Sequence, residues 1–491
     1  MSGTLRLRLS CERIAGRRFQ RTFASMRKIV SFAVVVFVSS GVALTLVDGA
    51  QAAGSPADSP SMFSPAIDAN LFSKPLALVD ALSIAELRNG AVLHARKEVE
   101  AQNGVAVQTK VVALPRVKGS SGYQTSDRAA QESFVPGFPK PNEQSWNAGI
   151  QVVQPIYEGG RVRAALRSSK LIRELALRHF ETVLADTIQD VRIAYADALL
   201  AREQIGVQEA SLNLLGKELE DARRRFEAGT VPQFNVLRAE TELGNARPRL
   251  IRARNASRTA KQNLINLLGQ HIPGAVGEEI PLELSGNLDV LAVTVELSSS
   301  LLEAMANRSE LAASRIAQGL RGEELNTARA GSRPRVEVFG GYGARSPQFD
   351  RDLGAGLAGW QTGAQVSWDL WDGGLTRGRI QEAQAKRDQA AIALDQVVRR
   401  VELEVRTAYS SFTETKELLA SQERVTQTAG EALRLANSRA EAGAATQLDV
   451  LSAQTSLTEA RTIYVQATRD YSVALTRLER ATGRLVTRAK F

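Results

Sequence analysis

The sequence predicts a mainly helical chain with four β-strands, arranged as two copies of one unit. Long proline-free stretches predict long helices, and short segments with alternating apolar and polar residues predict strands. A constant shift of 214 residues relates the two halves of the chain. Aromatic residues make up only 5% of the chain, while Ala, Leu, Arg, Glu and Gln are abundant, which favours long helices over a compact mixed core.

Residues 1–52 have the pattern of a secretory signal peptide. Arg27 and Lys28 precede the apolar run Ile29–Val47, and Ala50-Gln51-Ala52 follows as a small-residue cleavage signal. We expect cleavage after Ala52; a retained membrane anchor is the alternative. The segment holds eight Lys or Arg against two Asp or Glu, so it carries most of the formal charge of +9. That charge is therefore poor evidence for a nucleic-acid partner.

The internal repeat is visible without gaps over long stretches. Residues 226–269 match residues 440–483 at 15 of 44 positions, and Gly159-Gly160 matches Gly373-Gly374 at the same shift. Upstream of a proline-containing loop between Tyr123 and Trp146 the shift becomes 219. Shared helical composition alone does not produce a constant shift over more than a hundred residues. The pattern therefore predicts a duplicated domain.

Each copy is expected to run helix, strand, loop, strand, long helix, helix. In the first copy we predict a helix over Leu76–Leu114, strands at Arg116–Tyr123 and Asn147–Ile156, and a long helix from Gly160 to about Glu227. Seventy helical residues would span roughly 105 Å, which indicates a rod or tunnel. Breaks at Gly206, Gly216 or Gly430 remain open.

The predicted strands alternate in a way that is typical of a membrane surface. In Gln361–Trp371, Ala364, Val366, Trp368 and Leu370 fall on one face, and Ile150 and Val152 do so in the first copy. We expect these residues to face lipid, and Trp360, Trp371, Tyr157 and Tyr342 to lie near strand ends as interfacial aromatics. A half-buried strand of a soluble sheet is the alternative.

Four strands cannot close a barrel around a passage. Open strand edges in lipid leave backbone groups unpaired, so a chain that spans the membrane in this way has to oligomerise. Three copies supply twelve strands, which is enough for a transmembrane β-barrel with a water-filled lumen.

Turns between the elements are marked by glycine and proline. Pro155, Gly159, Gly160, Gly373 and Gly374 mark the strand-to-helix turns. Gly229 and Gly443 fit the left-handed ends of the long helices, and Pro232 fits the first turn of the next helix, so these residues mark two helical hairpin tips.

Polar residues follow both tips at equivalent positions. These are Gln233 and Asn235 in the first copy and Gln447 and Asp449 in the second. We expect them to form a gate, with Asp449 contributing to a ring of carboxylates at the narrow end of the tunnel. A solvated first-turn carboxylate, stabilised by the helix dipole, is the alternative for Asp449.

The residues that support enzymatic chemistry are missing from the sequence. His94, His179 and His271 are scattered, without partners at metal-ligand spacing, and the single cysteine, Cys11, lies in the predicted signal peptide. Phosphate loops and nucleophile elbows are also absent. We therefore expect no enzyme activity, no metal and no cofactor.

Several motifs resemble those of the TolC-like outer-membrane efflux proteins. The segments are Gln154–Arg161, Leu370–Gly374, Ala442–Gln454 and Leu478–Gly483, and the resemblance covers about residues 75–483. It implies a homotrimer with a twelve-stranded outer-membrane barrel and a long periplasmic α-helical barrel. It also implies an adaptor (membrane fusion) protein and an inner-membrane pump, ABC or proton-driven, as partners. Asn235 and Ser452 depart from the acidic residues that some members of the family carry.

The resemblance therefore implies an export duct for tripartite efflux or type I protein secretion. A periplasmic adaptor and a coiled-coil scaffold are the competing interpretations. The predicted division of the chain is a signal peptide at 1–52, an extension at 53–74, repeat 1 at 75–285, repeat 2 at 286–483 and a tail at 484–491.

Overall fold

The structure is a computed structural model that describes residues 74–125, 127, 144–271, 277, 280–288, 293–346 and 357–485. The predicted signal peptide with Ala50 and Ala52, most of the extension that follows it, and the proline-containing loop lie outside these residues. All described residues belong to one unit of the chain. None of the described helices is both long enough and apolar enough to cross a membrane.

The order of the elements is the predicted one. The first half contains α2 (Leu78–Arg88), α3 (Gly90–Lys110), η2 (Val111–Ala113), β1 (Arg116–Thr125), β2 (Gln144–Glu158), α4 (Arg161–Glu227) and α5 (Gln233–Leu267). The second half contains α6 (Leu297–Asn307), α7 (Ser309–Ala330), β3 (Arg335–Ser346), β4 (Leu357–Ser367), α8 (Leu375–Glu441) and α9 (Gln447–Thr482).

The two longest helices, α4 and α8, each contain 67 residues and begin 214 positions apart. Each runs without a break, so Gly206, Gly216 and Gly430 do not interrupt them. Each glycine lowers helix stability by about 1 kcal/mol relative to alanine. This cost is small compared with the stabilisation that tertiary packing gives to so long a helix.

The prediction of one helix over Leu76–Leu114 was wrong at Asn89. The backbone leaves the helical region there, and the Asn89 side chain accepts hydrogen bonds from the N–H groups of Ala91 and Val92. Its Nδ2 donates to the carbonyl of Leu267 at 2.7 Å. Asn89 therefore caps α3 and ties the break between α2 and α3 to the end of α5.

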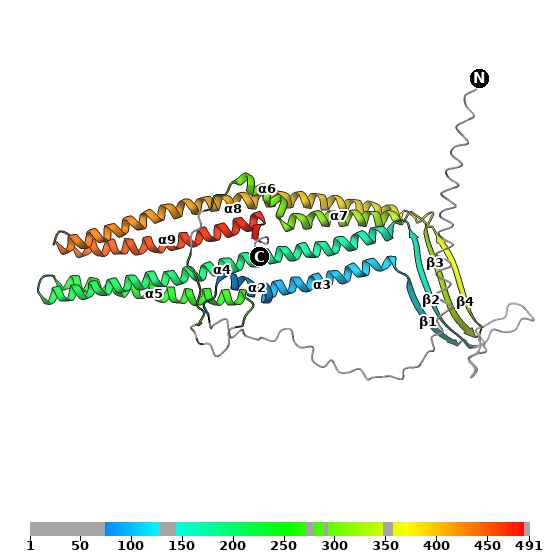
Figure 1. Ribbon diagram of the computed structural model, residues 1–491, viewed down its shortest axis with the longest axis horizontal. Helices are drawn as coiled ribbons and strands as arrows, with labels where there is room; N and C mark the ends of the chain where they lie inside the picture. Colours follow the sequence, from blue (N-terminus) through cyan, green and yellow to red (C-terminus); the bar gives the residue numbers. More distant parts are fainter. Residues whose placement is uncertain are drawn as a thin grey trace, which may run out of the picture. The chain divides into compact units, whose positions relative to one another are not determined.

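Each long helix packs against two shorter ones that follow one another along its length (Figure 1). α4 contacts α3 and α5, α8 contacts α7 and α9, and α4 joins the two sets through α7 and α9. Many of the buried positions on α4 are alanines, which let the helices approach closely. The largest core cluster joins α2, α4 and α5 around Val191, Tyr195, Leu264 and Ile265.

The four strands form one antiparallel sheet in the order β1-β2-β3-β4, at one end of the long helices (Figure 1). The register places Ile150 opposite Tyr342 and Tyr342 opposite Trp360, so these large apolar residues share one face. β1 and β2 contain the predicted strands and extend beyond them. Among the described residues, β1 and β4 each have one unpaired edge.

Trp368 and Leu370 were wrongly predicted to belong to a strand. β4 ends at Ser367, because its neighbour β3 begins at Arg335, the partner of Ser367. Residues after Ser367 therefore have no partner in β3 with which to form ladder hydrogen bonds. The indole Nε1 of Trp368 instead donates to the carbonyl of Ser332 at 3.1 Å.

Two pairs of left-handed glycines turn the chain from sheet to helix. Gly159 and Gly160 have φ angles of 63° and 105°, and Gly373 and Gly374 have 67° and 92°. The two turns differ in their surroundings. A Cβ on Gly159 would lie 2.6 Å from the carbonyl oxygen of Ala330, whereas a Cβ on Gly373 would meet nothing within 4 Å. Pro155 lies further back, at the point where the β2–β3 register shifts.

We predict that Gly159→Ala destabilises the protein more than Gly373→Ala. Both substitutions force a Cβ into a left-handed conformation, which costs roughly 1–2 kcal/mol, but only the first adds a clash with backbone. The measurement is the thermal transition followed by circular dichroism in detergent. Equal losses for the two variants would contradict the role of the Ala330 contact.

Candidate functional site

The two hairpin tips have the same backbone geometry. Gly229 and Gly443 have φ angles of 71° and 70° and follow Ala228 and Ala442, the C-cap residues of α4 and α8. In each tip the next N–H group reaches back to a helix carbonyl, from Thr230 to Arg225 at 2.9 Å and from Ala444 to Arg439 at 2.8 Å. This is the Schellman type of helix end, which requires the left-handed residue that glycine supplies.

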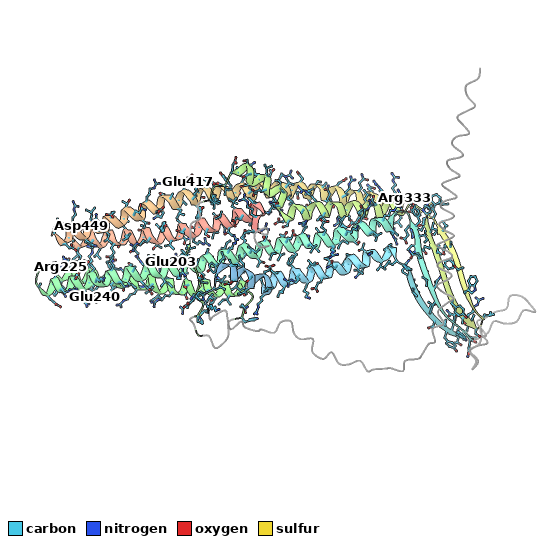
Figure 2. The ribbon with its side chains drawn as sticks, viewed as in Figure 1. Glu203, Arg225, Glu240, Arg333, Glu417 and Asp449 are labelled. Atoms are coloured by element: carbon cyan, nitrogen blue, oxygen red, sulfur yellow. The ribbon has the colours of Figure 1, made fainter. Side chains whose placement is uncertain are left out.

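The predicted gate residues occupy matching positions in α5 and α9. Gln233 and Gln447 are the first residues of these helices, and Asn235 and Asp449 are the third. Pro232 occupies the N-cap position of α5, without a side-chain capping hydrogen bond, one residue before the first turn in which the sequence placed it. Figure 2 shows Arg225 and Asp449 near the ends of the two hairpins.

Asp449 forms a capping box with Thr446. Its Oδ2 accepts hydrogen bonds from the Thr446 N–H and hydroxyl at 2.8 Å each, and the Asp449 N–H donates to Thr446 Oγ1 at 3.3 Å. These bonds to Thr446, first from its backbone and then from its side chain, lower the pKa of the Asp449 carboxyl. Asp449 is thus the first-turn carboxylate that the sequence offered as an alternative, and it stays ionised near neutral pH.

The described strands place all their charged residues on one face of the sheet, together with Val153, Phe339 and Leu357, and leave the other face uncharged. One face carries Ile150 and Val152 from β2 and Ala364 and Val366 from β4, all of them predicted to face lipid. Several large residues of this face are exposed, with Trp360 78% and Val366 67% exposed. The opposite face carries Gln151, Gln361 and Gln365 at the intervening positions.

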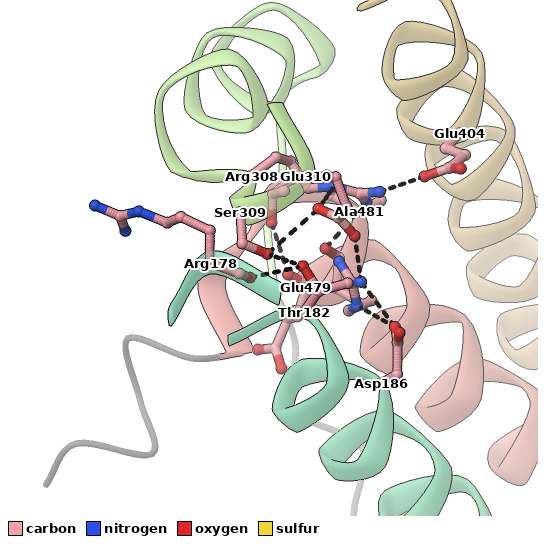
Figure 3. A network of polar contacts seen from close by, with 11 residues as sticks. Arg178, Thr182, Asp186, Arg308, Ser309, Glu310, Glu404, Glu479 and Ala481 are labelled. Atoms are coloured by element: carbon pink, nitrogen blue, oxygen red, sulfur yellow. Dashed lines mark hydrogen bonds and ion pairs between the residues drawn. The ribbon is translucent and has the colours of Figure 1, made fainter. Parts of the chain in front are cut away.

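A buried ionic network near the middle of the long helices was not predicted from the sequence (Figure 3). Arg308 lies between α6 and α7, with only 7% of its side chain exposed, and its guanidinium pairs with Glu310 and Glu404. It also donates to the carbonyls of Arg480 and Ala481 at 3.4 Å. Arg308 therefore holds the break between α6 and α7 against the end of α9, as Asn89 holds the other break against α5.

Arg480 extends this network to α4. Its guanidinium pairs with Asp186 and with Glu310, and nearby Arg192 pairs with Glu479 at 2.6 Å. Burial favours the neutral form of Arg480, but these two carboxylates outweigh it and raise the pKa of the guanidinium. The sequence carried no distinct signal of the network, because Glu479 and Arg480 stand among other charged residues such as Arg477 and Arg484.

We predict that Arg308→Ala lowers the free energy of unfolding by about 3 kcal/mol, because it leaves partly buried carboxylates without their counter-charge. The measurement is a denaturant titration followed by circular dichroism. Arg434→Ala is the control, because it removes an equally short but exposed pair with Glu431 and should cost at most about 1 kcal/mol. Equal effects of the two substitutions would show that burial of the network is unimportant.

The same network predicts a loss of stability in acid. Burial favours the neutral form of Glu310, but the hydrogen bond from Arg480 and the charges of Arg480 and Arg308 lower its pKa below the ordinary 4.5. A lowered folded-state pKa stabilises the protein above the ordinary value, and that stabilisation is lost as pH falls through the folded-state value. The Glu310→Gln variant should therefore have a lower free energy of unfolding at neutral pH than the unmodified protein. Its free energy of unfolding should also decrease less as the pH falls into the acidic range. A Glu431→Gln control should decline like the unmodified protein.

The comparisons with known proteins agree with this architecture. Residues 81–270 and 301–484 match the model of the family described as outer membrane efflux protein. The chain is 24% identical to the outer membrane efflux protein BepC of Brucella suis, over 82% of this chain and 86% of that protein. It is 26% identical to the cobalt-zinc-cadmium resistance protein CzcC of Cupriavidus metallidurans, over 84% and 90%.

The fold is also that of a solved channel. The outer membrane protein VceC of Vibrio cholerae superposes with a TM-score of 0.70 at 18% identity, over 83% of this chain and 96% of that one. The matched family consists of outer-membrane channels and not of enzymes, which confirms the predicted location and the predicted lack of enzyme activity. The two matched segments together cover most of the sequence, and the chain belongs to the outer membrane efflux protein family.

Proposed function

We propose that this chain forms, as a homotrimer, the export duct of a tripartite efflux or type I secretion system. The observation that carries the proposal is that the two sides of the chain are open and different. The sheet ends in β1 on one side and β4 on the other, among the described strands. The helices are arranged in a similar order across the chain. α3 and α5 lie at one side and α8 lies at the other, and α4, α7 and α9 lie between them.

Two different open sides favour head-to-tail contact between copies. Such contacts close into a ring when the rotation between copies allows it. In the ring, β4 of one copy would pair with β1 of the next, so that no strand edge would meet lipid. Three copies supply the twelve strands of a barrel with an aqueous lumen.

The two faces of the sheet support a membrane role for the barrel. In the proposed trimer the apolar face with Ile150, Val152, Ala364 and Val366 contacts outer-membrane lipid, and the face with Gln151 and Gln361 contacts water. An apolar face that is exposed in one chain needs a cover, and lipid is the cover that matches its composition.

The hairpin tips are the proposed gate and docking end. They lie at the end of α4 and α8 away from the sheet, so in a trimer six tips would surround the periplasmic mouth (Figure 1). We propose that Asp449, with Asn235, Gln233 and Gln447, lines this mouth, and that an adaptor linked to an ABC or proton-driven pump docks there. The duplicated repeats, 75–285 and 286–483, are supported by the equal lengths of α4 and α8.

We predict that Ile150→Arg prevents assembly in the outer membrane while Gln151→Arg is tolerated. The two residues are neighbours in the middle of β2 on opposite faces. An arginine on the lipid face costs roughly 2–4 kcal/mol per chain near the bilayer midplane, whereas one in the lumen stays hydrated. Membrane fractionation and heat-modifiable migration on gels measure assembly. Recovery of the unmodified chain in the soluble periplasmic fraction, without an oligomer, would refute the proposed function.

We predict that Asp449→Asn lowers the cation preference of the channel in planar bilayers. The asparagine oxygen can still accept the Thr446 N–H bond, so the substitution removes the charge and keeps the cap. Thr446→Val is the matched control, because it weakens the cap and keeps the charge. If Thr446→Val alters selectivity as much as Asp449→Asn, Asp449 acts through helix capping only.

A further inference from the structure

The charged residues of the described strands all lie on one face of the sheet. They are Arg116 and Lys118 of β1, Glu158 of β2, and Arg335, Glu337 and Arg345 of β3. The register distributes them along the strands: Glu158 lies opposite Arg335 at the end next to the helices, Lys118 lies opposite Gln151, and Arg345 lies opposite Asn147 at the far end. The apolar face carries no charge in these strands. The polar face therefore has four cations and two carboxylates in each chain.

Ion pairing leaves an excess of cations on this face. Glu158 is buried and forms an ion pair with Arg161 of α4 at 2.7 Å, although the geometry is not that of a hydrogen bond. Its charge is therefore already balanced from outside the sheet. Arg335 pairs with Asp369 at 3.5 Å. Within the described part of the chain, no ion pair forms with Arg116, Lys118 or Arg345, and Glu337 is the one carboxylate of the strands without such a pair.

The positive face continues where the sheet meets the helices. A cavity of about 180 Å³ lies there, lined by Glu158 and Arg335 from the strands, by Arg161 at the start of α4 and by Arg379, the fifth residue of α8. Arg161 is balanced by Glu158 and Arg335 is paired with Asp369, so Arg379 is the lining arginine that has no ion pair among the described residues. Arg116 and Lys118 are close to the same end of the sheet, because β1 begins there.

We propose that the sheet end of the duct selects for anionic solutes, through Arg116, Lys118, Arg335, Arg345 and Arg379. The inference rests on the proposed function, in which the polar face lines the aqueous lumen. Within a narrow lumen, fixed charges of one sign raise the local concentration of the opposite ion. The duct then has two filters of opposite sign in series, with Asp449 at the periplasmic mouth and cations at the sheet. A solute that carries both charges, or an anion that enters with its counter-ion, passes both filters.

The test is the reversal potential of the purified trimer in a planar bilayer under a potassium chloride gradient. The variant Arg116→Gln/Lys118→Gln removes two cations per chain from β1, at positions that have no ion pair to break in the described residues. We expect the cation-to-anion permeability ratio to rise by about two-fold, since lumen potentials in proteins reach several kT. Ser120→Gln, on the same face of the same strand, adds bulk without charge and should leave the ratio unchanged.

Salt concentration separates an electrostatic effect from a change in pore shape. The Debye length is about 10 Å at 0.1 M salt and about 3 Å at 1 M, so the difference between the variant and the unmodified channel should shrink sharply at high salt. An unchanged permeability ratio in the variant, or a difference that persists at 1 M, would overturn the inference while the channel itself stands. A trimer that inserts but conducts no ions would overturn the proposed function, and this inference with it.

Discussion

The packing of two shorter helices against each 67-residue helix is the constraint on which the rest of the structure depends. Neither α4 nor α8 contains a break, so their partners have to cover a length that no single neighbouring helix spans. α3 and α5 share the length of α4, and α7 and α9 share that of α8. Wherever one partner ends and the other begins, helix ends with unsatisfied backbone groups are brought into the interior.

Polar side chains stabilise these two meeting points by different chemistry. At Asn89 a neutral amide caps α3 and donates to the end of α5. At Arg308 a guanidinium reaches the end of α9 and draws in carboxylates from α7 and α8. The second solution needs a network, because a buried cation without partners would be far more costly than a buried amide.

The sheet obeys a different constraint, since both of its faces are open in one chain. The two faces therefore differ in charge: the strands place every charged residue on one face, which also carries Val153, Phe339 and Leu357, and they leave the other face uncharged. Glycines at close backbone contacts, such as Gly341 against Ile150, leave room for neighbouring strands to curve. The helical hairpin tips do not have two faces of different composition, and their backbone geometry follows from helix capping alone.

Only the structure showed that α4 and α8 run unbroken through Gly206, Gly216 and Gly430, whereas the sequence by itself determined the order of the elements, the glycine turns and the faces of the strands. All of these depend on periodicity and on residues such as Gly159 and Gly443, whose backbone conformation is a local property. The strand ends were less predictable, because β4 stops at Ser367 only where β3 ceases to offer a partner.

Only the tertiary structure decided the roles of Asn89, Arg308 and Arg480. Their long-range partners lie 96 to 294 positions away in the chain and belong to other helices, so no local pattern identifies them. Asp449 belongs to both classes. Its place at a tip was evident from the sequence, but its capping bond to Thr446 required backbone geometry. A short segment of sequence determines its own backbone conformation, whereas the pairing of buried charges depends on which distant helices pack together.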